Sequence, residues 1–244
     1  MSSITMQNMY RVRGIYRHAC PNCGGAISDL RLLYKAPCEE CLPEGVFREI
    51  ASRATGYSRV DRLKLYAKYV NRLSAQGLLK IIEEENKLSE FEEFFKKATG
   101  YSMWSAQKTW ARRLLRGESF SIIAPTGMGK TVFSLIAALN TTCNSNEQGK
   151  VYLAFPTTPL LIQSWKKLVE FAKNAGFEVC SEDEWDRENC LRVVYVHSKM
   201  SKKTKEFMLE KIKKGEFDIL LTTSAFMHRH YEIIPKGVFS LIVM

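Results

Sequence analysis

The octapeptide Ala124-Pro125-Thr126-Gly127-Met128-Gly129-Lys130-Thr131 decides the fold of this 244-residue chain. Residues 119–123 (Ser-Phe-Ser-Ile-Ile) before it predict a short buried strand, and the mostly apolar residues 132–139 after it predict a helix. A strand, a glycine-containing loop and a helix in this order form the context of a P-loop, which holds nucleotide phosphates. The sequence therefore predicts binding of ATP and Mg2+ at this loop.

Each residue type in the loop suits phosphate binding. Gly127 and Gly129 permit backbone angles that a side chain would forbid, so that loop amides and the helix N-terminus can face the phosphates. Lys130 is predicted to reach the β- and γ-phosphates, and Thr131 to offer its hydroxyl to Mg2+. The other predicted nucleotide-binding residues of the loop are Pro125, Thr126 and Met128. Ala124 stands where the general motif has glycine, a form similar to that of superfamily 2 helicases.

Upstream of the loop, Gln107 is a candidate for adenine recognition. A glutamine side chain donates and accepts hydrogen bonds together, as the adenine edge requires, and Tyr101 or Trp104 could stack on the base. The alternative is that Trp104 and Trp110 pack a helix while Gln107 lies on the surface. We favour the adenine contact because Gln107 accompanies a helicase-type P-loop.

Strand and helix patterns alternate downstream of the loop. Strands are predicted at residues 150–155, 191–196, 218–221 and 239–243, and helices at 161–174 and 199–214. This alternation predicts an α/β fold, in which a parallel sheet carries helices on both faces.

Short hydroxyl residues follow two of the predicted strands, at the sheet edge where ligands of such folds bind. They are Thr157 and Thr158, which follow Pro156 after the first strand, and Thr222, Thr223 and Ser224 after the third. Hydroxyls and backbone amides there suit contacts to the phosphates of DNA. The alternative is ordinary capping of the helices that follow. We favour the DNA contact because both stretches come after a P-loop.

Four cysteines near the start have the spacing of a metal site: Cys20, Cys23, Cys38 and Cys41. Each pair has a two-residue spacer, and 14 residues lie between the pairs. Two such knuckles predict a closed, structural zinc site with four thiolate ligands. Paired disulfides or a redox Cys-x-x-Cys are the alternatives, which a reducing compartment disfavours. The remaining cysteines show no such spacing: Cys143, Cys180 and Cys190.

The net charge of +10 is concentrated in the first half of the chain. Residues 1–118 hold 20 Lys/Arg and 13 Asp/Glu, whereas residues 119–244 hold 16 and 13. Basic and aromatic residues surround the cysteines: Tyr10, Arg11, Arg13, Tyr16, Arg17, Arg31 and Lys35. Such residues suit a nucleic acid, but they could equally only solubilise and pack the ribbon.

Between these motifs the pattern is mostly helical, and Gly56, Gly77 and Gly100 are each predicted to end a helix. The predicted organisation is a zinc ribbon over 1–42, a helical segment with the adenine-contact region over 43–118, and a P-loop lobe over 119–244. No apolar run is long enough to span a membrane and no secretory signal is recognisable, so a cytoplasmic location is expected.

Several stretches occur in the order typical of one family. They are Cys-Pro-Asn-Cys-Gly-Gly at 20–25 with its second pair, Trp-Ser-Ala-Gln-Lys-Thr-Trp at 104–110, the loop at 123–131, His197-Ser198, and Gly-Glu-Phe-Asp-Ile-Leu-Leu-Thr-Thr-Ser at 215–224. The chain thereby resembles the N-terminal part of the reverse gyrases, ATP-dependent type IA topoisomerases of hyperthermophiles that introduce positive supercoils. The resemblance implies a zinc ribbon and a first RecA-like lobe, with a second lobe and a topoisomerase region as partners.

The sequence departs from that family at its end. It stops at Met244, after a predicted strand, where superfamily 2 proteins carry an acidic motif that helps to hold Mg2+ and to orient the attacking water. We therefore expect a fragment with no complete catalytic set, which binds ATP and DNA but hydrolyses ATP poorly. The alternatives are a fragment of another superfamily 2 DNA or RNA helicase, and a non-catalytic zinc-ribbon module that binds nucleic acid.

Overall fold

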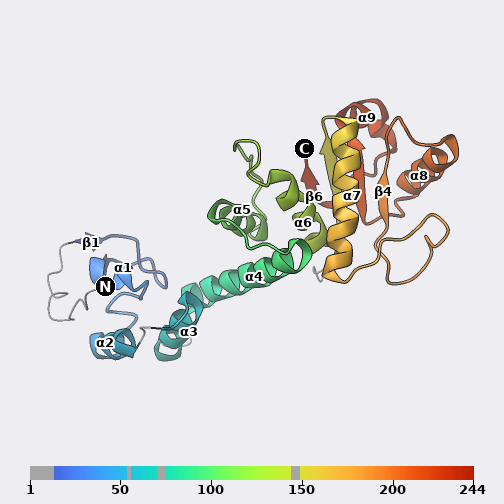
Figure 1. Cartoon of the computed structure of the whole chain (residues 1–244). Coiled ribbons are helices and arrows are strands. Elements are labelled where there is room, and N and C mark those ends of the chain that lie inside the picture. Colours follow the sequence, from blue (N-terminus) through green and yellow to red (C-terminus); the bar gives the residue numbers. More distant parts are fainter. Residues whose placement is uncertain (1–13, 54–55, 71–74, 144–148) are drawn as a thin grey trace. The chain divides into compact units, whose positions relative to one another are not determined.

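The computed structural model describes residues 14–53, 56–70, 75–143 and 149–244 (Figure 1). It divides into two compact units, Met1–Ser89 and Glu90–Met244. The division falls within a helix, and the predicted scheme of three segments stays a prediction. Tyr10, Arg11 and Arg13, which were candidates for contacts to nucleic acid, lie outside the described residues.

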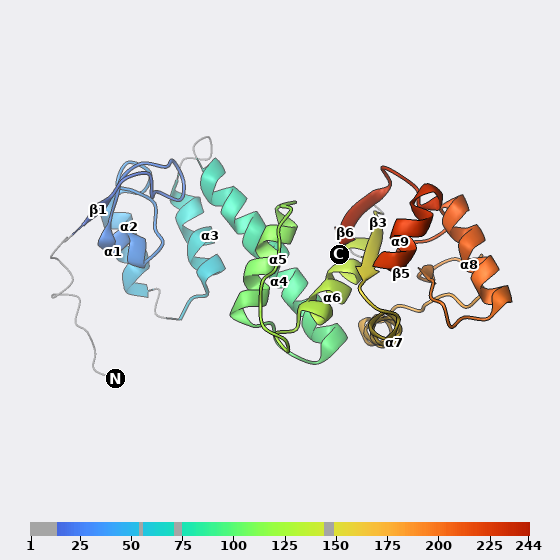
Figure 2. The ribbon, with the colours of Figure 1, turned by 90° about the horizontal axis from the view of Figure 1, so that it is seen from above.

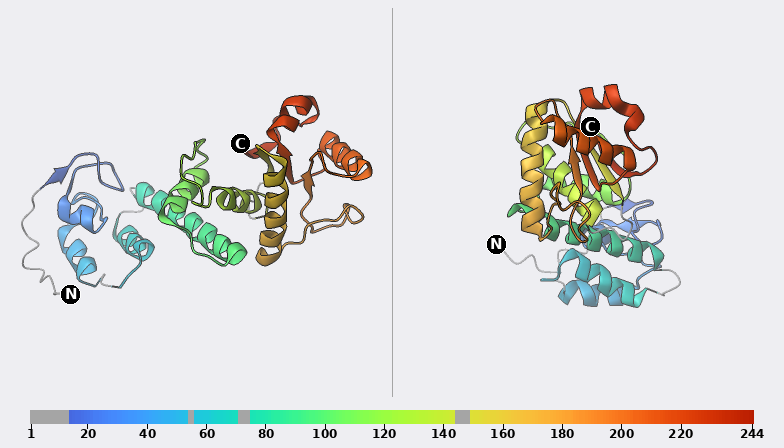
Figure 3. Two further views of the ribbon diagram at one scale, coloured as in Figure 1. Left: turned by 45° about the horizontal axis from the view of Figure 1, so that its top comes forward. Right: turned by 90° about the vertical axis from the view of Figure 1, so that its right-hand side faces the viewer.

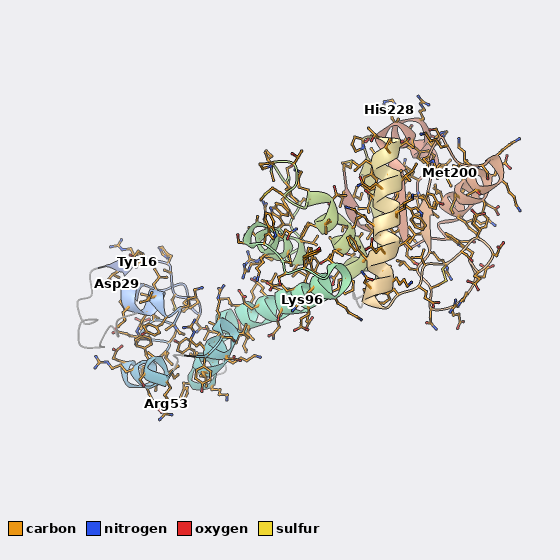
Figure 4. All side chains as sticks on the ribbon, in the orientation of Figure 1. Tyr16, Asp29, Arg53, Lys96, Met200 and His228 are labelled. Atoms are coloured by element: carbon orange, nitrogen blue, oxygen red, sulfur yellow. A yellow bond between two sulfur atoms is a disulfide. The ribbon has the colours of Figure 1, made fainter. Side chains whose placement is uncertain are left out.

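The first unit combines a small antiparallel ribbon with helices. Its elements are β1 (Ile15–Tyr16), β2 (Ile27–Ser28), α1 (Asp29–Leu33), α2 (Glu44–Arg53), α3 (Arg59–Tyr69) and the start of α4 (Gln76–Thr99). The Asp29 amide, at the start of α1, donates to the carbonyl of Gly14, so that Tyr16 and Asp29 lie near each other in Figure 4. The helices enclose a core that includes Phe47, Tyr66 and Leu78.

The second unit is built on a parallel sheet. Its elements are α5 (Ser105–Leu115), α6 (Lys130–Cys143), β3 (Lys150–Phe155), α7 (Thr158–Ala175), β4 (Val193–Tyr195), α8 (Lys202–Lys214), β5 (Ile219–Thr223), α9 (Ser224–His230), the 3-10 helix η2 (Tyr231–Ile233) and β6 (Phe239–Val243). The strand order is β4-β5-β3-β6, and every neighbouring pair is parallel. The predicted strands at 150–155 and 239–243 are confirmed with the same bounds.

Helices cover both faces of this sheet, as predicted. Alternate strand residues such as Tyr152 and Leu220 pack in one cluster with Met208 and Ile212 of α8 and Phe226 of α9. On the opposite face α6 contacts β3 and β6, while α7 contacts β3 and β5. Figure 2 shows α7 end-on, and the right panel of Figure 3 shows it across the sheet from the red helix α9. The alternation of side chains along each buried strand supplies both packing faces.

The end of α4 packs within the second unit. The ring of Phe91 contacts that of Phe133 on α6, and the ring of Phe94 contacts that of Phe177 just after α7. Lys97 donates from Nζ to the carbonyl of Ala175 at 2.6 Å. The helix then ends at Gly100, whose φ of 77° is the left-handed conformation that glycine adopts readily.

The predicted strand at residues 119–123 is wrong: this segment forms no strand, and Ile123 is 99% exposed. Local contacts hold the segment near the end of α5 instead. The Arg113 guanidinium lies 4.6 Å from the centre of the Phe120 ring and pairs with Glu118 at 2.8 Å. An apolar run becomes a strand only where another strand supplies hydrogen bonds, and its pattern alone does not show where that partner is.

Two smaller expectations are also corrected. Gly77 does not end a helix but is the second residue of α4. Cys180 and Cys190, which showed no spacing signal, form a disulfide, because the bridge between Val179 and Leu191 brings the flanks of the loop together. No helix within the described residues has the length and apolar character needed to cross a membrane.

Candidate nucleotide and metal sites

The predicted phosphate loop forms a tight turn that leads directly into α6. Gly127 and Gly129 have φ angles of 86° and 75°, which confirms that the turn needs glycine at both positions. The carbonyl of Gly129 accepts the first helical hydrogen bond, from Phe133. The loop therefore lies at the N-terminus of a 14-residue helix, where unpaired amides and the helix dipole favour an anion.

The Lys130 ammonium group is folded into this turn. Its Nζ donates to the carbonyls of Ala124 at 2.5 Å and Pro125 at 2.8 Å. The positive charge is thus held inside the loop by neutral carbonyl acceptors, which a negatively charged phosphate oxygen can replace with a stronger bond. Thr131 follows on the first turn of α6 and is half-buried, as are Met128 and Gly129, whereas Pro125, Thr126 and Gly127 are exposed.

Gln107 lies against the loop, although it is distant in sequence. It is 5% exposed, and its Nε2 would lie 2.7 Å from a Cβ built on Gly129. Its Oε1 accepts from the amide of Trp104 at 3.0 Å. The placement beside the loop is compatible with the predicted adenine contact, which stays a prediction.

The aromatic side chains near Gln107 differ in their exposure to solvent. Tyr101 is 76% exposed and Trp104 is 57% exposed, so both are open to a base. Trp110 instead packs edge-on against Phe133, with ring centres 5.5 Å apart, as the packing alternative expected.

The hydroxyl residues meet at one edge of the sheet. Parallel pairing sets Phe155 opposite Thr223, and the Ser224 hydroxyl donates to the carbonyl of Phe155 at 3.4 Å. Thr157 and Thr223 also cap α7 and α9, since their side chains accept from the amides of residues 160 and 226. The capping alternative is thus confirmed for Thr157 and Thr223, and the DNA contact stays a prediction.

The members of this edge differ in accessibility. Pro156 and Thr157 are exposed, and Thr158 and Thr223 are half-buried. Thr222 is fully buried, with its hydroxyl 2.7 Å from that of Tyr152. Thr222 is therefore placed to support its neighbours. A direct DNA contact suits Pro156, Thr157, Thr158 and Thr223 better.

The segment after β4 adds residues that sequence reasoning did not assign to the site. Because β4 is parallel to β5, its end lies at the same edge; Met200, labelled in Figure 4, is on this segment. His197 accepts at Nδ1 from the amide of Lys199 at 3.2 Å. Burial, aided by the charge of Lys199, lowers the pKa of His197, so the ring is neutral near pH 7. Sequence reasoning had no signal that His197 would lie at this edge of the sheet.

The four predicted metal ligands come together in the first unit. The sulfur atoms of Cys20, Cys23, Cys38 and Cys41 all lie within 4.8 Å of one another. Four sulfur atoms placed tetrahedrally around one Zn2+ ion, each at about 2.3 Å, lie about 3.8 Å apart, which is within this limit. The arrangement therefore fits the predicted four-thiolate zinc site, and no position would remain open for catalysis.

Backbone amides already point at these sulfur atoms. The Gly25 amide donates to Cys23 Sγ and the Cys38 amide donates to Cys20 Sγ, each at 3.3 Å. Burial raises the pKa of Cys20, but hydrogen bonds from the backbone of Cys23, Cys38 and Asn22 outweigh it and lower the pKa to about 7. Burial, together with the neighbouring thiols, raises the pKa of Cys41 to about 12. Amide donors of this kind favour the thiolate form that binds metal.

Arg31, which was a candidate for contacts to nucleic acid, is buried. Its guanidinium donates to the carbonyls of Pro37 at 2.8 Å and Leu42 at 2.9 Å, and to the Glu44 carboxylate at 2.8 Å. Its side chain thus frames the second knuckle, which confirms the packing alternative for this residue. Tyr16 and Arg17 are exposed and remain candidates for a nucleic acid.

Comparisons with known proteins agree with this anatomy. Residues 104–243 match the DEAD/DEAH box helicase family, and residues 12–51 match the reverse gyrase zinc finger. The chain is 43% identical to a reverse gyrase of Thermococcus kodakarensis over 93% of its own length and 12% of that protein. It is 39% identical to a reverse gyrase of Pyrococcus furiosus over 92% of the chain and 17% of that protein.

A third relative gives the same result. Identity to reverse gyrase 1 of Aquifex aeolicus is 37%, over 95% of the chain and 17% of that protein. The chain thus spans less than a fifth of the length of each of these three relatives. The chain belongs to the DEAD/DEAH box helicase family, and it is similar to the reverse gyrases, whose zinc finger it also matches.

Proposed function

We propose that this chain is the part of an ATP-dependent DNA topoisomerase that binds ATP through its P-loop and DNA along the carboxyl edge of its sheet. The observation that carries the proposal is that one chain contains both a P-loop at the start of α6 and a four-thiol cluster, and that this chain is similar to reverse gyrases. In the whole protein, the expected activity is the introduction of positive supercoils into DNA, together with a second lobe and a topoisomerase region.

At the nucleotide site, the chain supplies binding and charge. The loop amides and Lys130 would hold the phosphates, Thr131 would contribute its hydroxyl to Mg2+, and Gln107 would recognise the adenine. Mg2+ would neutralise phosphate charge when bound. That the 244-residue chain turns ATP over slowly stays a prediction, which phosphate release from the purified chain tests.

At the sheet edge, the proposed path for DNA runs across the ends of β3, β5 and β4. Thr157, Thr158 and Thr223 offer short hydroxyls, and the lysines at the start of α8 extend the path with positive charge. Hydroxyls, backbone amides and lysines are the groups that contact DNA phosphates without reading sequence. The zinc ribbon would be a structural element whose exposed Tyr16 and Arg17 can add contacts.

The testing experiment compares Lys130→Ala with wild type for binding of a fluorescent ATP analogue in the presence of Mg2+. Loss of a charge-assisted bond predicts a Kd about ten- to a hundredfold higher. Lys173→Ala, which removes an exposed charge near the end of α7, is the matched control and should bind as wild type does. Equal affinity of Lys130→Ala and wild type would reject the nucleotide site.

A second measurement, of DNA affinity with and without nucleotide, distinguishes the proposal from the alternative of a non-catalytic zinc-ribbon module. DNA binding by wild type should change when nucleotide is added, and Lys130→Ala should show no such change. If nucleotide leaves the DNA affinity of wild type unaltered, the chain acts as a zinc-ribbon module that binds nucleic acid independently of ATP.

A further inference from the structure

The Asn22 side chain joins the metal cluster to the start of α4. Its Nδ2 donates to Sγ of Cys41 at 3.4 Å, and its Oδ1 accepts from the backbone N–H of Leu78 at 3.3 Å. Asn22 lies between the two cysteines of the first knuckle, whereas Leu78 lies 56 residues further along the chain. One amide group therefore contacts both a predicted metal ligand and a helix terminus.

The first turn of α4 has a need that Asn22 meets. The first amides of a helix have no partner inside it, and a nearby Ser, Thr, Asp or Asn normally accepts from one of them. The residues at this end are Ala75, Gln76 and Gly77, none of which is such a side chain. Leu78 is fully buried, so water does not readily replace the missing acceptor. Asn22 thus acts as a helix cap supplied from a distant part of the sequence.

Gly77 allows this close approach. A Cβ at Gly77 would overlap the carbonyl oxygen of Asn22, so any larger residue would push the knuckle away from the helix. Glycine disfavours helix formation, and its presence at the second position of α4 is explained by this contact. Two independent observations, the bifunctional amide and the missing Cβ, therefore describe the same junction.

We propose that Asn22 is a positioning residue that links metal binding at the four cysteines to the ordering of the first turn of α4. A metal-bound Cys41 is a thiolate, which accepts a stronger hydrogen bond than a thiol does. That bond fixes the rotation of the Asn22 amide, with Nδ2 toward the sulfur and Oδ1 toward Leu78. Because linkage is reciprocal, an ordered first turn in turn holds the knuckle in the geometry that binds metal. The inference rests on the proposed zinc site.

The test uses the full 244-residue chain, loaded with Zn2+ or stripped by a chelator, and follows hydrogen exchange in a peptide covering residues 76–82. In wild type, removal of zinc should speed exchange at Leu78 by about tenfold or more, as expected for an amide that loses its cap. Asn22→Ala should exchange fast even with zinc bound, and its zinc affinity should fall about tenfold, as for other partners of metal ligands.

Asn22→Asp separates the two halves of the amide. It keeps an acceptor for the Leu78 amide but loses the donor to sulfur, so exchange should stay slow while zinc binds more weakly. Wild-type zinc affinity and slow exchange in Asn22→Ala would overturn the link, as would unchanged exchange at Leu78 in stripped wild type. If wild type binds no zinc at all, the metal site itself is rejected, and the link with it.

A glycine pair gives the matched control, since Gly45 and Gly77 are both the second residue of a helix. A Cβ on Gly45 meets no heavy atom within 4 Å. Gly45→Ala should therefore raise Tm by about 2–4 °C through helix propensity alone. Gly77→Ala should lower Tm, speed exchange at Leu78 and weaken zinc binding. A rise in Tm for Gly77→Ala equal to that for Gly45→Ala would show that the junction imposes no constraint.

Discussion

Arg31 shows how one side chain can close a loop that has little core of its own. It is 1% exposed, and its guanidinium lies 4.7 Å from the centre of the Phe47 ring while bonding to two carbonyls and to Glu44. The planar fork of arginine presents several donors in fixed directions, whereas a lysine offers a single compact charge. Arg31 therefore couples the second knuckle to α2.

We predict that Arg31→Ala destabilises the chain by about 2–4 kcal/mol, because it leaves buried carbonyls without donors and removes a packed side chain. The matched control is Arg48→Ala, since Arg48 pairs with the same carboxylate at 2.8 Å but is exposed. That change should cost about 0.5 kcal/mol or less. Urea unfolding of the zinc-loaded chain measures both, and equal effects would show that burial of Arg31 contributes nothing.

Glu44 makes part of this interaction sensitive to pH. Burial raises the pKa of its carboxyl group, but hydrogen bonds and charge from Arg48 and Arg31 outweigh it and lower the pKa. A lowered pKa means that the stabilisation is present above the pKa of the unfolded chain and is lost as pH falls through the folded value. Wild type should therefore lose this stabilisation in acid, whereas Arg31→Ala lacks the contact between Arg31 and Glu44. The difference in free energy of unfolding between the two proteins should become smaller as pH falls.

Single residues were predictable where their chemistry depends on local spacing. The four cysteines and the P-loop glycines carry their geometry in the sequence, because two-residue spacers and a tight turn are local constraints. Asn22 and Arg31 were not predictable, since their partners Leu78 and Glu44 become neighbours only after folding. The disulfide between Cys180 and Cys190 was missed for the same reason.

At the scale of elements, α8 has an uneven distribution of charge. At its C-terminal end, Lys214 pairs with Glu210 and Lys211 pairs with Glu216, each at 2.6 Å. At its N-terminal end, Lys203 and Lys205 form no ion pair within the part of the chain that the structure describes. Cations at a helix N-terminus are electrostatically unfavourable, so the unneutralised lysines suit a phosphate partner at this edge of the sheet.

We predict that the double change Lys203→Gln with Lys205→Gln weakens binding of single-stranded DNA and reduces the salt dependence of the affinity. Each lost phosphate contact lowers the slope of log K against log salt by about 0.7. The matched control is Lys213→Gln with Lys214→Gln, which removes the same charge from the other end of α8. Fluorescence anisotropy over a salt series measures both pairs, and equal losses would show that only net charge matters.

Helices and strands were predictable from the sequence where their apolar residues are buried against other elements of the fold. Residues 150–155 follow this rule, since five of their six side chains are buried. Residues 239–243 have no buried side chain, although their bounds were also predicted correctly. The segment 119–123 did not form a strand because periodicity reports an apolar face but not a hydrogen-bonding partner. Likewise, Gly77 is a contact point rather than a helix end, a role set by a residue more than fifty positions away.

For the molecule as a whole, the two compact units differ in what stabilises them. The sheet of the second unit is buried on both faces by helices. Among the described residues, the apolar cluster around the cysteines is small and includes Cys20, Ile27 and Cys38, although Ala36 and Leu42 join the larger core of the first unit. A segment of this size does not bury enough surface to be stable alone, so bound metal must supply the difference.

We therefore predict that a chelator removes hydrogen-exchange protection from residues 19–42 and leaves residues 150–155 and 219–223 protected. Mass spectrometry of exchanged peptides, before and after metal removal, measures both regions in one sample. Restoring Zn2+ should restore protection of the ribbon. Simultaneous opening of ribbon and sheet at the same chelator concentration would contradict separate stabilisation.

One edge of the sheet has a practical consequence. Within the described residues, β6 pairs only with β3, and its side chains alternate between half-buried and exposed, with Ile242 at 53% exposure. The backbone donors and acceptors along its other side form a template on which a strand from another molecule can assemble. Purified on its own, this chain should aggregate through β6 at high protein concentration. It should store best in dilute solution and in solvents that disfavour strand pairing between molecules.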